Sequence, residues 1–148
     1  MLRNNLCMLV AEDDDDDFIL VAEAARKASL DVNLARVRDG EELLDYLLRR
    51  GRHAARDKEP SLILLDISMP GKNGFEALKE IKSIPGIRSI PVIVVTNAYS
   101  AEDIDRAYNL GAASFIQKSL EFQRFIHSFK VMKQYWFETV LLPKGPPT

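Results

Sequence analysis

Five short runs of apolar or β-branched residues recur along this chain of 148 residues, and stretches with a helical pattern separate them. The runs are 6–11, 32–37, 62–65, 92–95 and 114–116. After the third run, Phe75, Leu78 and Ile81 recur at the spacing of one helix face. Strands that alternate with helices form a parallel sheet, because each helix returns the chain to the same end of the sheet. The pattern therefore predicts an α/β fold with five parallel strands.

The composition of these runs predicts the order of the strands. Runs 62–65 and 92–95 are apolar at every position, which is typical of strands that helices cover on both faces. Run 32–37 mixes polar with apolar residues and is therefore expected at an edge of the sheet. If it lies outside the first strand, the order is 2-1-3-4-5, a common doubly wound arrangement whose ligand crevice lies between the first and third strands.

Length, charge and cysteine content narrow the class of protein. We expect one domain over residues 1–133, followed by a C-terminal extension over 134–148 that is not a separate domain. With 20 basic and 22 acidic residues the formal net charge is −2, which leaves no basic excess for binding nucleic acid. The apolar runs are too short to span a membrane, and Cys7 is the single cysteine, so we predict a cytoplasmic protein with no membrane partner.

Two segments lie outside the predicted strands and helices. Residues 49–60 are mostly polar, include a glycine and a proline, and are predicted to form a long loop after the second helix. Tyr135, Trp136 and Phe137 follow the fifth predicted helix, and large apolar rings are seldom left in water. Either they fold back on the domain, the more frequent outcome, or they are buried in an interface, which predicts a homodimer.

Groups that can carry chemistry follow the predicted strands. They are Glu12, Asp13, Asp66, Thr96 and Lys118. The carboxyl ends of parallel strands meet at one edge of the sheet, so we expect these groups to converge there. Clustered carboxylates repel one another unless a cation lies between them, and hard oxygen ligands suit Mg²⁺. A carboxylate beside Mg²⁺, an ammonium and a hydroxyl can attack phosphorus, which makes Asp66 the candidate nucleophile.

The aspartate run 13–17 has a plainer explanation for its later members. Acidic side chains in the first turn of a helix are stabilised by the positive end of the helix dipole. We assign Asp15, Asp16 and Asp17 to that role. The turn-forming segment 69–74 follows Asp66 closely and is expected to leave its carboxylate accessible.

Over roughly residues 6–133 the chain resembles a response regulator receiver domain of two-component phosphorelay signalling. The matching segments are LVAEDD at 9–14, LLDISMPGKNGFE at 64–76, PVIVVTNA at 91–98 and LGAASFIQKS at 110–119. The resemblance implies the flavodoxin-like receiver fold. It also implies that Asp66 accepts a phosphoryl group from a sensor histidine kinase in a Mg²⁺-dependent reaction, and that the protein signals through protein–protein interaction. It would be no enzyme beyond promoting its own phosphorylation and dephosphorylation.

The resemblance also implies a role for each site residue. It gives these metal ligands: Glu12, Asp13, Asp66 and the backbone carbonyl of Ser68. Lys118 would pair with the phosphoryl group. Thr96 would turn its hydroxyl toward that group, and the rotamer of Phe115 would follow the movement as a switch.

Within this family the chain is similar to the stand-alone regulators associated with bacterial phytochromes. The shared features are the longer loop at 49–60 and a C-terminal extension at 135–143. This similarity implies a bacteriophytochrome kinase as partner, and some of these relatives form homodimers.

Three residues depart from the family pattern. Ser119 stands where a proline usually follows the lysine in a cis peptide bond, and a cis bond before serine costs about 2.5 to 4 kcal/mol. We therefore expect the loop that carries Lys118 to shift. Asn97 stands at a position that is usually small or hydroxylated, where its amide would donate to the phosphoryl group or crowd it. Glu12 replaces an aspartate, which is common in the family.

Three other classes of function stay open at this point. A receiver that takes no phosphate and acts as a scaffold is compatible with the departures at Asn97 and Ser119. A Mg²⁺-dependent phosphohydrolase would also use an aspartate nucleophile, but it usually has a second aspartate where this chain has Ser68. A flavodoxin-like FMN protein would need a phosphate-binding loop after the first strand, where this chain has the acidic run 12–17.

Overall fold

Five parallel strands form the centre of the protein, in the order β2-β1-β3-β4-β5. The computed structural model describes residues 6–56, 59–69, 73–97, 99–118 and 121–143. The strands are β1 (Cys7–Ala11), β2 (Asn33–Val37), β3 (Leu62–Leu65), β4 (Val92–Thr96) and β5 (Ser114–Gln117). Each lies within a residue or two of a predicted run, so the predicted strands, their order and the edge position of β2 are confirmed.

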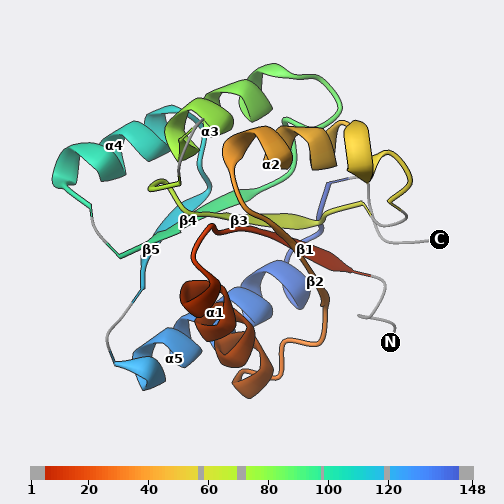
Figure 1. Ribbon diagram of the computed structural model, residues 1–148. Coiled ribbons are helices and arrows are strands. Elements are labelled where there is room, and N and C mark those ends of the chain that lie inside the picture. The colour runs from red at the N-terminus through yellow and green to blue at the C-terminus, as the bar shows by residue number, and fades with distance from the viewer. Residues whose placement is uncertain (1–5, 57–58, 70–72, 98, 119–120, 144–148) are drawn as a thin grey trace.

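Helices cover both faces of this sheet. They are α1 (Asp15–Lys27), α2 (Gly40–Leu47), α3 (Gly74–Ser83), α4 (Ala101–Asn109) and α5 (Phe122–Met132). Figure 1 shows α2, α3 and α4 on one side of the sheet and α1 and α5 on the other. The fold is therefore the doubly wound α/β arrangement that the sequence predicts. No helix in the described part of the chain combines the length and apolar character that crossing a membrane requires.

The sheet separates two apolar cores, because successive side chains of a strand point to opposite faces. Leu9 and Ile63 pack into the core beneath α2, α3 and α4. Met8 and Leu64 pack into the core beneath α1 and α5. All four are at most 1% exposed, and this burial on both faces of the sheet fixes the positions at which β1 and β3 end.

Side chains cap the first four long helices at the points where the chain leaves the sheet. The capping residues are Asp14, Asp39, Asn73 and Ser100, each of which accepts from the backbone N–H three residues later. Such a cap stabilises a helix end by about 1 kcal/mol. The caps therefore define where the strand-end loops stop and the helices begin.

Gly74, the first residue of α3, lies directly against the chain that follows β3. A Cβ atom at this position would lie 2.5 Å from the Ile67 Cα and 2.7 Å from the Asp66 carbonyl oxygen. Backbone atoms cannot rotate away as a flexible side chain can. The close approach of α3 to Asp66 thus depends on glycine.

Gly74→Ala is expected to lower the free energy of unfolding by about 2 kcal/mol, because the added methyl group overpacks a backbone contact. Urea denaturation measures this change. Lys79→Ala, at an exposed position of the same helix, is the control and should change the value by less than about 0.5 kcal/mol. Equal values for Gly74→Ala and the unchanged protein would contradict the packing argument.

The segment 49–60, predicted as a loop, contains a short 3₁₀ helix, η2 (Gly51–His53). Arg56 fastens the segment to α2: its Nε donates to the Tyr46 carbonyl at 2.6 Å, and its guanidinium lies 4.9 Å from the centre of the Tyr46 ring. It also donates to the Leu47 carbonyl. The prediction of a long connection is correct, but the segment is anchored by side-chain contacts that no local pattern reveals.

The C-terminal aromatic residues continue α5 as a π-helical turn, η3 (Lys133–Phe137). Trp136 and Phe137 are half-buried and pack against the core beneath α1 and α5. Tyr135 is 51% exposed, and its ring meets that of Trp136 edge to face at 5.0 Å. Folding back therefore covers two of the three rings and leaves Tyr135 in solvent.

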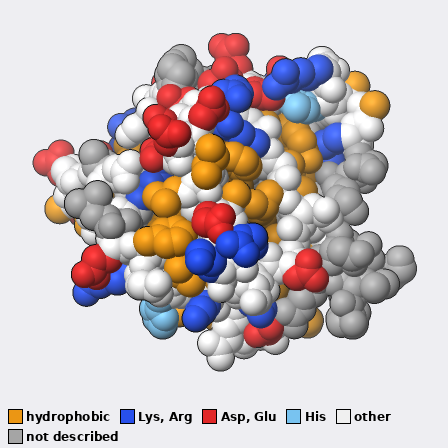
Figure 2. Space-filling view, turned by 60° about the horizontal axis from the view of Figure 1, so that its bottom comes forward, with side chains coloured by type: hydrophobic (Ala, Val, Ile, Leu, Met, Phe, Trp, Pro, Cys, Tyr) orange, Lys and Arg blue, Asp and Glu red, His pale blue; other side chains and the backbone are white. Residues whose placement is uncertain are grey.

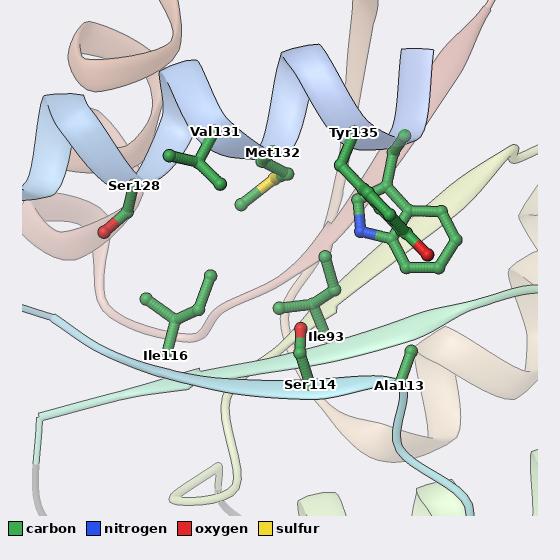
Figure 3. Close-up of a pocket in the computed structure, with 9 residues that line it drawn as sticks. Ile93, Ala113, Ser114, Ile116, Ser128, Val131, Met132 and Tyr135 are labelled. Atoms are coloured by element: carbon green, nitrogen blue, oxygen red, sulfur yellow. The ribbon is translucent and has the colours of Figure 1, made fainter. Parts of the chain in front are cut away.

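An apolar cavity of about 450 Å³ lies between this turn and the sheet. Figure 3 shows Ile93 and Ile116 on the strands facing Met132 and Tyr135 on the helical side, and Trp136 also lines the cavity. The C-terminal turn thus packs loosely against β4 and β5.

Candidate functional site

Three carboxylates converge at the carboxyl edge of the sheet. Glu12 and Asp13 follow β1, and Asp66 follows the neighbouring strand β3. One carboxylate oxygen of each lies within 4.8 Å of the others. Glu12 and Asp66 are only 2% and 7% exposed, whereas Asp13 is half-buried. The structure therefore brings these carboxylates together at the crevice between the first and third strands, as the sequence predicts.

Backbone contacts hold Glu12 in place. Its N–H donates to the Val37 carbonyl at 3.0 Å, and its own carbonyl accepts from the Arg36 Nε at 3.0 Å. Its Oε2 accepts from the Asp14 N–H at 3.2 Å. The end of β2 therefore fixes the backbone of Glu12, and the residue before α1 holds its carboxylate.

Asp66 is held in a similar way. Its N–H donates to the Ala11 carbonyl at 3.1 Å, which extends the pairing of β3 with β1 by one residue. Its Oδ1 accepts from the Ser68 N–H at 2.9 Å, a local turn that directs the carboxylate. Ser68 is thus at the site, while metal binding by its carbonyl stays a prediction.

Lys118 reaches the site from the end of β5. Its N–H donates to the Thr96 carbonyl at 3.0 Å, and the residue is buried, with 4% exposed. Its ammonium forms an ion pair with the Glu12 carboxylate and lies 3.4 Å from Asp66 Oδ2. Ser119, with its expected effect on the loop, lies outside the described residues, but Lys118 itself is at the site.

Burial and charge change the acid–base properties of the buried pair. Burial is the main reason that the pKa of Glu12 rises to about 7; the Asp66 charge adds to the rise, and the hydrogen bond from Lys118 opposes it. Burial disfavours the charged form of Lys118, but the hydrogen bond to Glu12 and the neighbouring carboxylates outweigh it and raise the pKa of the lysine. Lys118 therefore stays an ammonium.

Thr96 and Phe115 lie on the two strands beside the site. Thr96 ends β4 and is 1% exposed. Phe115, on β5, is half-buried, and its ring meets that of Tyr99 edge to face at 5.4 Å. The Tyr99 hydroxyl donates to Gln117 at 3.2 Å. The switching roles of Thr96 and Phe115 stay predictions, and Tyr99 is a neighbour that the sequence patterns did not indicate.

Asp17 takes part in a contact that the helix-dipole interpretation left out. Its Oδ2 lies 3.2 Å from Lys118 Nζ and accepts from Asn97 Nδ2 at 3.3 Å. Asn97 thus donates to Asp17 in this structure. One sequence signal was available: the first turn of α1 follows Glu12 and Asp13 directly, so it starts at the edge where the site lies.

The donor set fits a divalent cation. Carboxylate oxygens are hard ligands, and three of them within 4.8 Å in a largely buried site gain from a neutralising ion. A lysine ammonium at the same place can neutralise charge on a phosphoryl oxygen. The arrangement is therefore suited to metal-dependent chemistry on phosphorus.

Comparison with known proteins defines the family. The family model of the response regulator receiver domain matches residues 8–130 of this sequence. The chain therefore belongs to the response regulator receiver domain family. Receiver domains bind a divalent metal, and the carboxylate cluster fits that property. The resemblance seen in the sequence is confirmed, and with it the receiver fold and a role in signalling.

Particular relatives are similar over nearly the whole chain. The response regulator Rcp1 of Synechocystis sp. is 33% identical over 136 residues, which is 92% of this chain and 92% of Rcp1. The structure of the phosphorylated cyanobacterial phytochrome response regulator RcpA is 34% identical, with a TM-score of 0.85 over 94% of this chain and 99% of that one. The structure of the Mn²⁺-bound form of Rcp1 is 33% identical, with a TM-score of 0.83 over 93% of this chain and 99% of that one.

Proposed function

We propose that this protein is a phosphorylation-dependent signalling switch in which Asp66 accepts a phosphoryl group from a sensor histidine kinase. The observation that carries the proposal is the carboxylate cluster of Glu12, Asp13 and Asp66 with the Lys118 ammonium in contact with it. This arrangement gives a nucleophile, ligands for a metal and a fixed positive charge at one place.

In the proposed reaction an oxygen of Asp66 attacks the phosphorus of a phosphohistidine on the kinase. The P–O bond forms as the P–N bond breaks, and the imidazole leaves with the electron pair. Glu12, Asp13, Asp66 and the Ser68 carbonyl would hold Mg²⁺, which when bound neutralises charge on the transferring phosphoryl oxygens. Lys118 and the hydroxyl of Thr96 would contact the same oxygens. Water later hydrolyses the acyl phosphate, and the protein catalyses no reaction other than these two.

The signal in this proposal passes to a protein partner. Thr96 would turn toward the phosphoryl group and Phe115 would follow, which changes the surface around β4 and β5. Figure 2 shows hydrophobic side chains gathered near the middle of the face that carries α1 and α5, with charged side chains around them. Ile19 on α1 is 62% exposed, which supports docking of a protein on this face.

The kinase in this proposal is a bacteriophytochrome. The support is that similar solved structures are named phytochrome or bacteriophytochrome response regulators. One of them is the bacteriophytochrome response regulator RtBRR, which is 34% identical to this chain with a TM-score of 0.76. The match covers 96% of this chain and 84% of the RtBRR chain. A kinase phosphorylated from ATP works in the cytoplasm, and the proposal therefore includes that location.

Mass spectrometry tests the proposed function. The protein is incubated with Mg²⁺ and acetyl phosphate, and the phosphate is then localised by peptide mapping. An acid-stable, base-labile adduct on Asp66 that depends on Mg²⁺ is the expected result. A protein that takes no phosphate is a scaffold instead, and continuous release of phosphate from unrelated phosphomonoesters identifies a phosphohydrolase.

We also propose that residues 134–148 are an extension of the 1–133 domain that supports a homodimer. Tyr135 and Val131 support this, since they are 51% and 49% exposed on neighbouring turns. Truncation after Lys133 is expected to convert the dimer to a monomer in sedimentation experiments. Tyr108→Ser, which alters a ring with 48% exposure on α4, is the control and should leave the dimer intact. A full-length chain that is monomeric at every concentration would contradict the proposal.

A further inference from the structure

We infer that Asp17 is a positioning residue that competes with the incoming phosphoryl group for the Lys118 ammonium and thereby slows phosphoryl acceptance at Asp66. The inference rests on the proposed function, because it concerns the same reaction at Asp66. It comes from a contact between α1 and the end of β5, residues 101 positions apart in the chain. A role in the helix dipole alone does not account for this contact.

The ammonium of Lys118 has three N–H donors and three carboxylate neighbours. These neighbours are Glu12, Asp17 and Asp66. The lysine is nearer to Asp17 Oδ2, at 3.2 Å, than to Asp66 Oδ2, at 3.4 Å. The resting arrangement thus provides a carboxylate for each donor, and a phosphoryl oxygen must replace one of these partners.

Asp17 is the partner that the phosphoryl group has to displace. Glu12 and Asp66 belong to the carboxylate cluster that fits a metal ion, so a bound cation lowers their hold on the lysine. Asp17 lies outside that cluster, so a cation bound there does not weaken its attraction for Lys118. The Asp17 carboxylate therefore competes with the phosphoryl oxygens for the Lys118 ammonium during phosphoryl transfer.

The position of Asp17 is fixed by other contacts. Its backbone N–H donates to the capping side chain of Asp14 at 3.0 Å, which anchors the residue in the first turn of α1. Asn97 donates to the same oxygen that faces Lys118, at 3.3 Å. The side chain of Asp17 is 29% exposed, while that of Lys118 is 2% exposed. A fixed carboxylate can hold a buried lysine without itself being buried.

The test compares Asp17→Asn with Asp16→Asn in the full chain. Both variants remove one negative charge from the same helix turn, but Asp16 is exposed and Asp17 faces Lys118. Labelling by acetyl phosphate with Mg²⁺ should be about three- to tenfold faster in Asp17→Asn, because the lysine is freed and repulsion of the incoming dianion falls. Asp16→Asn should stay close to the rate of the unchanged protein.

A second readout does not depend on phosphorylation. The ¹⁵Nζ resonance of Lys118, assigned by its loss in Lys118→Arg, should shift in metal-free Asp17→Asn and stay in place in Asp16→Asn. Equal labelling rates for the two variants would overturn the inference and leave the proposed function intact. So would a Lys118 ¹⁵Nζ resonance that does not shift in Asp17→Asn. An unchanged protein that takes no label overturns the proposed function, and the inference with it.

Discussion

Replacing Asp66 with asparagine is expected to abolish phosphoryl acceptance while the protein stays folded. The amide has nearly the shape of the carboxylate and still offers an oxygen to the Ser68 N–H, which lies 2.9 Å from Asp66 Oδ1. It lacks the anionic oxygen that attacks phosphorus. Incubation with Mg²⁺ and acetyl phosphate, followed by intact-mass measurement, should show the adduct in the unchanged protein and none in Asp66→Asn.

The control for this prediction is Asp45→Asn. Asp45 is a half-exposed carboxylate on α2 that pairs with Arg50, outside the carboxylate cluster. Its replacement should leave labelling unchanged. Circular dichroism spectra of the two variants should coincide, which shows that lost labelling is not lost folding. Persistent labelling of Asp66→Asn at another single residue would contradict the assignment of the nucleophile.

The sheet was predictable because the patterns that define it are local and strong. The apolar runs over β3 and β4 mark strands buried on both faces, and the mixed run over β2 marks an edge. Parallel topology then brings Glu12, Asp66 and Lys118 to one edge although they are far apart in the chain. That step needs no knowledge of side-chain directions, so convergence of the site could be predicted.

What could not be predicted depends on the direction of individual side chains. Asp17 is one of five consecutive aspartates, and no spacing rule singles it out as the one that meets Lys118. Arg56 binds the carbonyls at the end of α2, a contact that depends on how the connecting segment folds back. The half-exposed ring of Tyr135 likewise follows from the π-helical turn, which sets the rotation of the residues after α5.

The metal-free protein is expected to lose stability as the pH rises from about 5 to about 7.5. Glu12 has a pKa of about 7 in the folded protein, raised by burial from its ordinary value of 4.5. The folded state therefore binds more protons than the unfolded state between these two values, so the free energy of unfolding falls with increasing pH in this window. The stabilising effect of the protonated carboxyl is complete below 4.5 and is lost as the pH passes 7.

The full rise of the Glu12 pKa from 4.5 to about 7 corresponds to about 3 kcal/mol, since one pKa unit is worth about 1.4 kcal/mol. Urea denaturation in the presence of a chelator, at about pH 5 and about pH 7.5, should show about 2 kcal/mol of it, because the ionisation is not complete at either end of the window. Glu12→Gln should remove most of the difference, because the amide does not ionise. Glu23→Gln is the control: the hydrogen bond from Arg26 lowers the pKa of this half-exposed carboxyl below its ordinary value of 4.5. Glu23 is therefore already ionised throughout the window, and its replacement should leave the pH dependence unchanged.

Mg²⁺ should oppose the loss of stability at higher pH, because metal ligands must be deprotonated to bind. The rise in the thermal unfolding midpoint on adding Mg²⁺ is expected to be larger at about pH 7.5 than at about pH 5, where Glu12 still holds its proton. In Glu12→Gln the rise should depend much less on pH. If the metal-free protein has the same stability at both pH values, Glu12 is not a buried acid with a raised pKa. If Mg²⁺ stabilises the protein equally at both, Glu12 does not bind the metal.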